Sequence, residues 1–118
     1  MRQKFLLVAF ISCLLLFVTH LIALRFDLYY NSSLTDTTTH TLAGIAVASV
    51  FCYALSLTGR KLSMGRVVIF VLMVGILWEV LEVKSGMTSI TDSRYLLDTA
   101  GDLFFDVFGG FLLSILTS

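Results

Sequence analysis

The sequence predicts an all-α fold, a four-helix transmembrane bundle with both termini cytoplasmic. Three observations lead to this prediction. First, 58% of the 118 residues are hydrophobic, 14% are charged and none is proline, which is a composition typical of membrane proteins. Second, four apolar segments are each long enough to cross about 30 Å of hydrocarbon. Third, the eight basic and eight acidic residues cancel and form no run of like charge, so nothing indicates nucleic acid as a partner, and the lipid bilayer is the expected one.

Polar connections separate the four predicted spans. The first apolar segment is longer than that of a signal peptide, about 7–15 residues, and no A-x-A-like cleavage site follows it, so we expect a retained anchor. We predict connections at residues 25–39, 58–66 and 84–96, with Asp36 as the cap of the second span. These connections are too short to hold a second domain. Residues 1–118 are therefore expected to form a single transmembrane domain, with spans at about 5–24, 40–57, 67–83 and 97–116.

Basic residues give the expected orientation. Five fall at one end of the predicted bundle and three at the other, and an excess of Lys and Arg is typical of the cytoplasmic side. The larger group is Arg2, Lys4, Arg60, Lys61 and Arg66, and the smaller group is Arg25, Lys84 and Arg94. We therefore expect a multi-pass protein of the bacterial inner (plasma) membrane whose two longer polar connections face outward.

The last span carries three carboxylates. Asp98, Asp102 and Asp106 are spaced four residues apart. Because an α-helix turns by about 100° per residue, steps of four drift by only about 40°, so the three share one helix face. An ionisable group near the bilayer centre costs about 2.5–3.5 kcal/mol on insertion scales. Asp102 and Asp106 therefore need partners, a bound cation or protons, whereas Asp98 is shallow enough to be solvated.

Polar residues of the other spans are predicted to lie at the same depth. Glu79 and Glu82 occupy the outer part of the third span, and His40 opens the second span with Asp36 one turn before it. Carboxylate and imidazole groups are ligands of divalent cations, so a divalent cation is the cofactor that this set would hold. The predicted polar site comprises Asp36, His40, Glu79, Glu82, Arg94, Asp98, Asp102 and Asp106. The hypothetical metal ligands among them are Asp102, Asp106, Glu79 and His40.

Members of this set also have structural explanations. Arg94 is compatible with an ordinary interfacial ion pair, and Glu82 and Asp98 with solvated helix ends. Asp102 and Asp106 are compatible with protonated acids that bond across helices.

Polar and small residues elsewhere in the spans have simpler interpretations. His20, alone in its span, is expected to be a packing residue, and Trp78 suits the membrane interface. Cys13 and Cys52 lie in apolar segments, where a thiol behaves as a small hydrophobic group. The glycines of the spans are expected to serve helix packing. No hydrolase or zinc-protease motif occurs, so whether the chain is an enzyme is left open.

Three motifs resemble the VanZ-like family, or a related group of small uncharacterised bacterial membrane proteins. Residues 36–40, Asp-Thr-Thr-Thr-His, are similar to the D-x-x-x-H with which a span of that family begins. Glu79 and Glu82 resemble the acidic end of its next span. Residues 102–109 are similar to its closing D-x-x-x-[ND]-x-x-G, with Arg94 upstream. The resemblance covers roughly residues 36–113 and implies an envelope role without supplying a reaction.

The chain also departs from the VanZ-like pattern. Asp106 stands where asparagine is frequent, Glu82 where glutamine is usual, and Gly44 where an aromatic residue is common. These departures make the site more acidic, which is compatible with a sister group rather than with VanZ proper.

Three functions fit these observations. The first is a site near the outer face that binds a cation or a lipid-linked or cell-wall ligand, with an envelope-related role. The second is a component of proton- or cation-coupled transport; no internal repeat or broken-helix signal favours a complete transporter, although a homo-oligomer could build one. The third is a noncatalytic accessory membrane subunit whose acids hold the bundle together.

Overall fold

The computed structural model describes residues 2–117, without the side chains of residues 30 and 31, and all of its regular structure is helical. The helices are α1 (Arg2–Arg25), α2 (Leu28–Asn31), α3 (Ser33–Leu57), α4 (Met64–Ser85) and α5 (Tyr95–Leu116). Four of them, all but the single turn α2, are long and apolar enough to cross a membrane. The predicted all-α fold with four membrane-spanning helices is confirmed.

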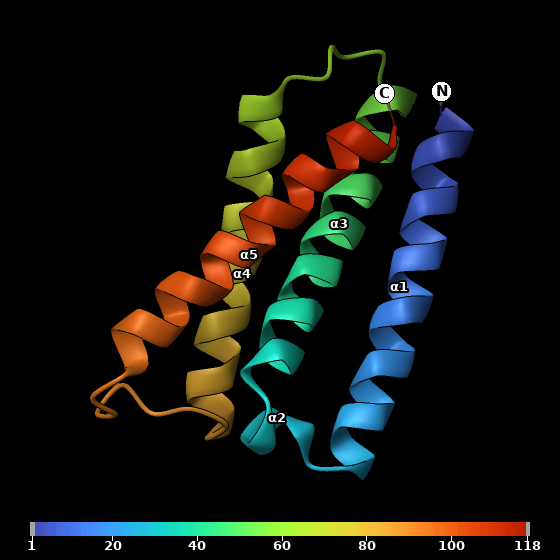
Figure 1. Ribbon diagram of the computed structural model, residues 1–118. Helices are drawn as coiled ribbons and strands as arrows, with labels where there is room; N and C mark the ends of the chain where they lie inside the picture. The colour runs from blue at the N-terminus through green and yellow to red at the C-terminus, as the bar shows by residue number, and fades with distance from the viewer. Residues whose placement is uncertain (1, 118) are drawn as a thin grey trace.

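The long helices form a bundle around α3. Helix α3 packs against α1 on one side and against α4 and α5 on the other, while α5 crosses diagonally over α3 and α4 (Figure 1). Both termini lie at the same end of the bundle, opposite α2 and the connection between α4 and α5 (Figure 1). We refer to these as the terminal end and the distal end.

Helix α1 illustrates how the apolar sequence divides between core and lipid. Its buried residues Phe5, Ala9, Ser12 and Ala23 follow steps of about three and four, the spacing of a helix seam. Large apolar side chains cover the rest of the helix, and Phe10 is 68% exposed. In water such exposure would be unfavourable, but in a bilayer these side chains contact lipid.

Glycines bring α5 close to its neighbours. A Cβ atom on Gly44 of α3 would collide with the backbone carbonyl oxygen of Asp106, and one on Gly109 of α5 would collide with that of Thr41. Gly75 of α4 makes similar room, because a Cβ there would lie 2.7 Å from Asp106 Oδ2. The predicted packing role therefore holds for these three glycines, and their placement presses the middle of α5 against both α3 and α4.

The predicted connection at residues 25–39 is wrong over its second half. Helix α3 begins at Ser33, so Asp36 lies in its first turn, and the N-cap position belongs to Ser32 in an extended conformation. The hydroxyl-rich sequence remains helical because its side chains bond back to the preceding turn: Thr38 Oγ1 donates to Leu34 O at 2.8 Å, and Thr41 Oγ1 to Thr37 O at 2.8 Å. The negative charge of Asp36 in the first turn also stabilises the helix through its interaction with the positive end of the helix dipole.

The other two connections are shorter than predicted. Ser63 caps α4 by accepting a hydrogen bond from Arg66 N at 3.3 Å, so this helix begins at Met64 and includes the end of the turn expected at 58–66. The same helix continues to Ser85 and ends at Gly86, whose φ of 81° is the left-handed conformation that glycine adopts at helix ends. Helix α5 begins at Tyr95.

Candidate functional site

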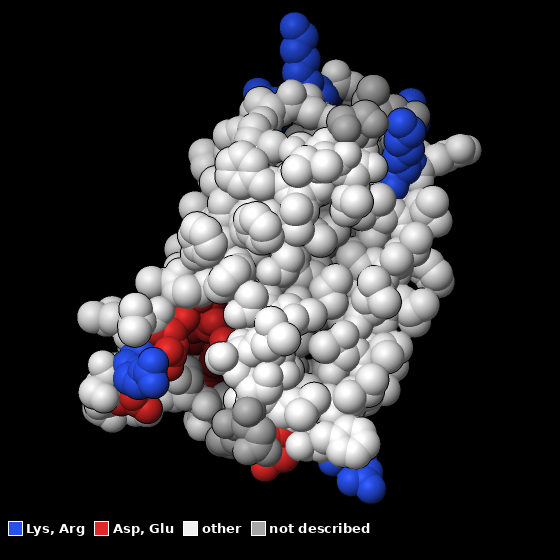
Figure 2. Space-filling model, in the orientation of Figure 1, with Lys and Arg blue, Asp and Glu red and all other residues white. Residues whose placement is uncertain are grey.

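Acidic side chains gather in the distal half of the bundle. Figure 2 shows acidic atoms in a hollow between α5 and the distal half of α3, with uncharged atoms around most of it and a basic side chain at one edge. The antiparallel course of the helices explains the clustering: α3 starts at this end, α4 ends there and α5 starts there again (Figure 1). Polar residues at the start of α3, the end of α4 and the first half of α5 therefore meet at one level.

His40 lies at the centre of the first group of side chains. Its Nδ1 is 3.0 Å from Asp106 Oδ1, and its Nε2 lies 3.5 Å from Asp102 Oδ1 and 3.6 Å from Asp36 Oδ1. The side chains of His40 and Asp106 are only 10% and 8% exposed, whereas that of Asp36 is 48% exposed. The imidazole thus joins two carboxylates of α5 to one near the start of α3.

Glu79 is the most confined acid on the α4 side. It is 5% exposed, and its Oε2 accepts a hydrogen bond from Thr99 Oγ1 at 3.1 Å. Its Oε1 is buried without any hydrogen-bond partner among the described residues. A buried carboxylate oxygen with no donor is costly, so this atom identifies a place where a proton, a water or a cation is needed.

Two groups of possible ligands share one residue. Ligand atoms of Asp36, His40 and Asp102 lie within 4.8 Å of one another, and so do those of Glu79, Glu82 and Asp102. Asp102, whose side chain is 15% exposed, is common to both. The geometry therefore connects the acids of α4 to the histidine of α3 through a single carboxylate of α5.

The charged groups of this cluster are almost all acidic. Within residues 2–117, none of the five carboxylates forms an ion pair with a Lys or Arg side chain, and three of them, Asp36, Asp102 and Asp106, lie 3.0–3.6 Å from His40. The five are Asp36, Glu79, Glu82, Asp102 and Asp106. Fully ionised carboxylates at membrane depth repel one another strongly, so they must share protons or bind cations.

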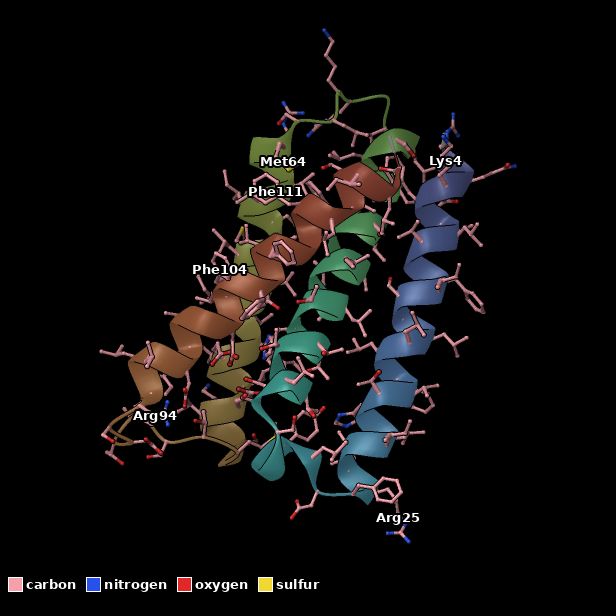
Figure 3. The ribbon with its side chains drawn as sticks, in the orientation of Figure 1. Lys4, Arg25, Met64, Arg94, Phe104 and Phe111 are labelled. Atoms are coloured by element: carbon pink, nitrogen blue, oxygen red, sulfur yellow. The ribbon has the colours of Figure 1, made fainter. Side chains whose placement is uncertain are left out.

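Two residues of the predicted polar site lie apart from this cluster. Arg94 is exposed at the N-cap of α5, where its backbone N–H donates to Asp92 Oδ1 at 2.8 Å, and its side chain extends beside the connection before α5 (Figure 3). Within residues 2–117, the Arg94 side chain forms no ion pair with an acid, so the ordinary ion pair that was the alternative for this residue is not seen. Asp98 is exposed as well. Both therefore flank the site instead of lining it.

The drift of the helix explains why Asp98 lies outside. The inward face of α5 follows Thr99, Asp102, Asp106, Gly109 and Leu113, in alternating steps of three and four. Alternating steps stay on one face of a helix with about 3.6 residues per turn, whereas repeated steps of four rotate away from it. The four-residue spacing therefore predicted the inward positions of Asp102 and Asp106 correctly, but it wrongly placed Asp98 on the same face.

Sequence reasoning also missed two polar neighbours. Thr99 donates to Glu79 from the inward face of α5, and the alternating spacing just described would have identified it. Tyr29 lies in α2, and its hydroxyl is 2.7 Å from His20 Nδ1. Burial raises the pKa of the Tyr29 phenol above its ordinary value, and the negative charges of Asp36 and Glu82 raise this pKa further. No pattern in the sequence pointed to Tyr29.

Two further side-chain hydrogen bonds lie in the distal half. Trp78 Nε1 donates to Glu82 Oε1 at 2.8 Å, one helical turn further along α4. His20, expected to be a packing histidine with its polar atoms satisfied, is exposed on α1 and contacts the ring and the hydroxyl of Tyr29 in α2.

These features define an integral membrane protein of helical type with a largely buried cluster of carboxylates around one histidine. The model of a family described as "Predicted membrane protein (DUF2238)" matches residues 2–118, and the chain belongs to that family. The match does not confirm the VanZ-like assignment. No curated protein and no solved structure matches the chain.

Proposed function

We propose that this protein binds a divalent cation at its distal carboxylate cluster and uses it to hold a phosphate-bearing envelope lipid. The observation that carries the proposal is the buried Glu79 Oε1, which has no hydrogen-bond partner within the described residues and belongs to a residue whose carboxylate lies within ligand distance of Glu82 and Asp102. A cation there would satisfy the orphaned oxygen and offset the repulsion between the three acids.

The donor set favours particular ions. Carboxylate oxygens suit Mg²⁺, Ca²⁺ and Mn²⁺, and the imidazole nitrogen of His40 adds affinity for Mn²⁺ or Zn²⁺. Mn²⁺ accepts both kinds of ligand, so it is the best single probe.

The setting of the cluster supports a lipid as the ligand. The hollow in Figure 2 opens on the side of the bundle, below the large apolar area that would contact lipid tails. A ligand that enters from this side would bring a headgroup to the carboxylates while its tails stay in the bilayer. A bound cation would supply the positive charge that a phosphate group requires.

Orientation and location form part of the same proposal. The terminal end carries Arg2, Lys4, Arg60, Lys61 and Arg66, and this excess favours the cytoplasmic side. The acidic hollow would then face the outer leaflet of the bacterial inner membrane, where envelope lipids are assembled or modified.

A distant relationship to VanZ-like proteins agrees with this role. One resembling motif contains Asp36 and His40, and another contains Asp102 and Asp106. In the structure all three aspartates lie around the imidazole of His40. Separate motifs that converge in space are easier to explain as one shared site than as chance similarity.

The test is the thermal stability of the detergent-purified protein with Mg²⁺, Ca²⁺, Mn²⁺ or Zn²⁺ added separately. A ligand that binds only the folded state at 100 times its Kd stabilises it by about 2.7 kcal/mol, so we expect a clear rise in Tm with Mn²⁺. The rise should vanish in Asp102→Asn and persist in Asp98→Asn, a matched change on the exposed side of α5. No rise with any of the four ions would overturn the proposal.

A further inference from the structure

We infer that the distal cluster is a two-cation centre in which Asp102 bridges the two ions. This inference rests on the proposed function and goes beyond it, because cation binding alone would be satisfied by a single ion. Its basis is that Asp102 belongs to both groups of ligand atoms, one shared with Asp36 and His40 and the other with Glu79 and Glu82.

The first position lies at His40 Nε2. This nitrogen is 3.5 Å from Asp102 Oδ1 and 3.6 Å from Asp36 Oδ1, so the three atoms surround a point that an ion can reach with small adjustments. His40 Nδ1 lies 3.0 Å from Asp106 Oδ1, and in the tautomer whose Nδ1–H donates to an ionised Asp106 the lone pair of Nε2 is left for an ion at that point. A carboxylate behind a histidine is the usual support of a metal-bound imidazole.

This arrangement gives Asp106 a role that differs from the predicted one. Asp106 was predicted as a metal ligand, but its Oδ1 is occupied by the imidazole and its Oδ2 points to the small space beside Gly75 of α4. Asp106 is therefore a positioning residue that fixes the tautomer and orientation of His40. The residues that bind the first ion are Asp36, His40 and Asp102.

The second position lies at Glu79 Oε1. The other oxygen of Glu79 accepts from Thr99, and Glu82 Oε1 accepts from the Trp78 indole, so both carboxylates are already held in place. Each is left with one oxygen free of these bonds, and for Glu79 that oxygen is buried without a partner. Carboxylate oxygens of Glu79, Glu82 and Asp102 lie within 4.8 Å of one another, an all-oxygen set suited to a hard cation.

Charge favours two ions over one. Five carboxylates around a neutral His40 carry a charge of about −5, and one divalent cation would leave about −3 at membrane depth, where each uncompensated charge is costly. Two divalent cations leave about −1. A bridging carboxylate is also the common element of two-metal sites, whose ions lie about 3.5–4 Å apart.

The experiment uses Mn²⁺ as the probe and the full chain in detergent. After saturation and removal of free ion, we expect two Mn²⁺ per chain by elemental analysis. The electron paramagnetic resonance spectrum should show a spin-coupled pair, because ions that share a carboxylate interact magnetically. One Mn²⁺ per chain with the six-line spectrum of an isolated ion would overturn the two-cation centre while leaving the proposed function intact. No bound Mn²⁺ would overturn both.

Variants separate the two positions. Glu79→Gln should retain one uncoupled Mn²⁺ at the histidine position, Asp36→Asn should retain one at the glutamate position, and Asp98→Asn should keep the coupled pair. If Glu79→Gln and Asp36→Asn both kept two coupled ions, the assignment of ligands would be wrong. Because the wild-type spectrum alone distinguishes a pair from a single ion, the inference stays testable even if a variant does not fold.

Discussion

The two ends of the bundle use the same three helices in opposite ways. At the terminal end, the inward side chains of α3, α4 and α5 include Ala48, Val71 and Leu113, which pack with Phe5 of α1 in an apolar core. At the distal end the corresponding inward positions hold His40, Glu79, Asp102 and Asp106 instead. The terminal half shows that apolar residues suffice to join these helices. Burying the distal acids therefore costs free energy that helix packing does not require, and this is the reason to assign function to that half.

The crossing of α5 divides these two halves, and breaking it should have the largest effect. Gly109→Leu would force a side chain into the backbone carbonyl of Thr41, and overpacking of this kind costs about 1–3 kcal/mol or more. We expect loss of folded, monodisperse protein in size-exclusion chromatography. Gly101→Ala is the matched control on the same helix, since a Cβ there has nothing within 4 Å. Equal behaviour of the two variants would contradict the close crossing.

Removing the carboxylate that positions His40 should have the next largest effect, and this effect should be confined to the distal half. Asp106→Asn keeps the shape of the side chain but weakens its hold on the imidazole, and loss of such a partner lowers metal affinity by about 10–100-fold. The Kd for Mn²⁺ should rise accordingly in calorimetric titrations, with little change in Tm without metal. An unchanged Kd would mean that Asp106 does not position His40.

A substitution in the terminal core should have the reverse signature. Val71 is 2% exposed, and Val71→Ala removes packed methyl groups, at a cost of about 1 kcal/mol. We expect a lower Tm and an unchanged Kd for Mn²⁺. A change in this Kd as large as that of Asp106→Asn would show that the two halves are not independent.

The smallest effect concerns the hydrogen bond between α5 and α4. Thr99→Val keeps the volume of the side chain and removes the donor to Glu79 Oε2, and such bonds in membrane proteins contribute about 0.6 kcal/mol on average. A slight drop in Tm and a modest rise in the Kd for Mn²⁺ are expected. Thr88→Val, outside the helices, serves as the control; a drop in Tm as large as that of Gly109→Leu would contradict this weak role.

The sequence predicted the fold well because each long helix contains an apolar stretch of membrane-spanning length. It also predicted that acids of three helices meet, since the alternating direction of successive spans fixes which ends lie together. Side-chain detail was less accessible. Steps of four residues rotate slightly away from the inward face of α5, and this rotation excludes Asp98 from the cluster. The position of Arg94 follows from the backbone conformation at the N-cap of α5. The place of Tyr29 could not be predicted because α2 is a single helical turn, too short to show a periodic pattern.

The central claim is that the distal acids bind a cation instead of sharing protons. Isothermal titration of Mn²⁺ into the wild-type protein, Asp102→Asn and Asp98→Asn in detergent tests it directly. We predict saturable binding to the wild type and to Asp98→Asn, and none to Asp102→Asn. Absence of binding to the wild type, with Asp102→Asn as stable as the wild type, would contradict the claim, because a neutral asparagine replaces a protonated aspartic acid without loss.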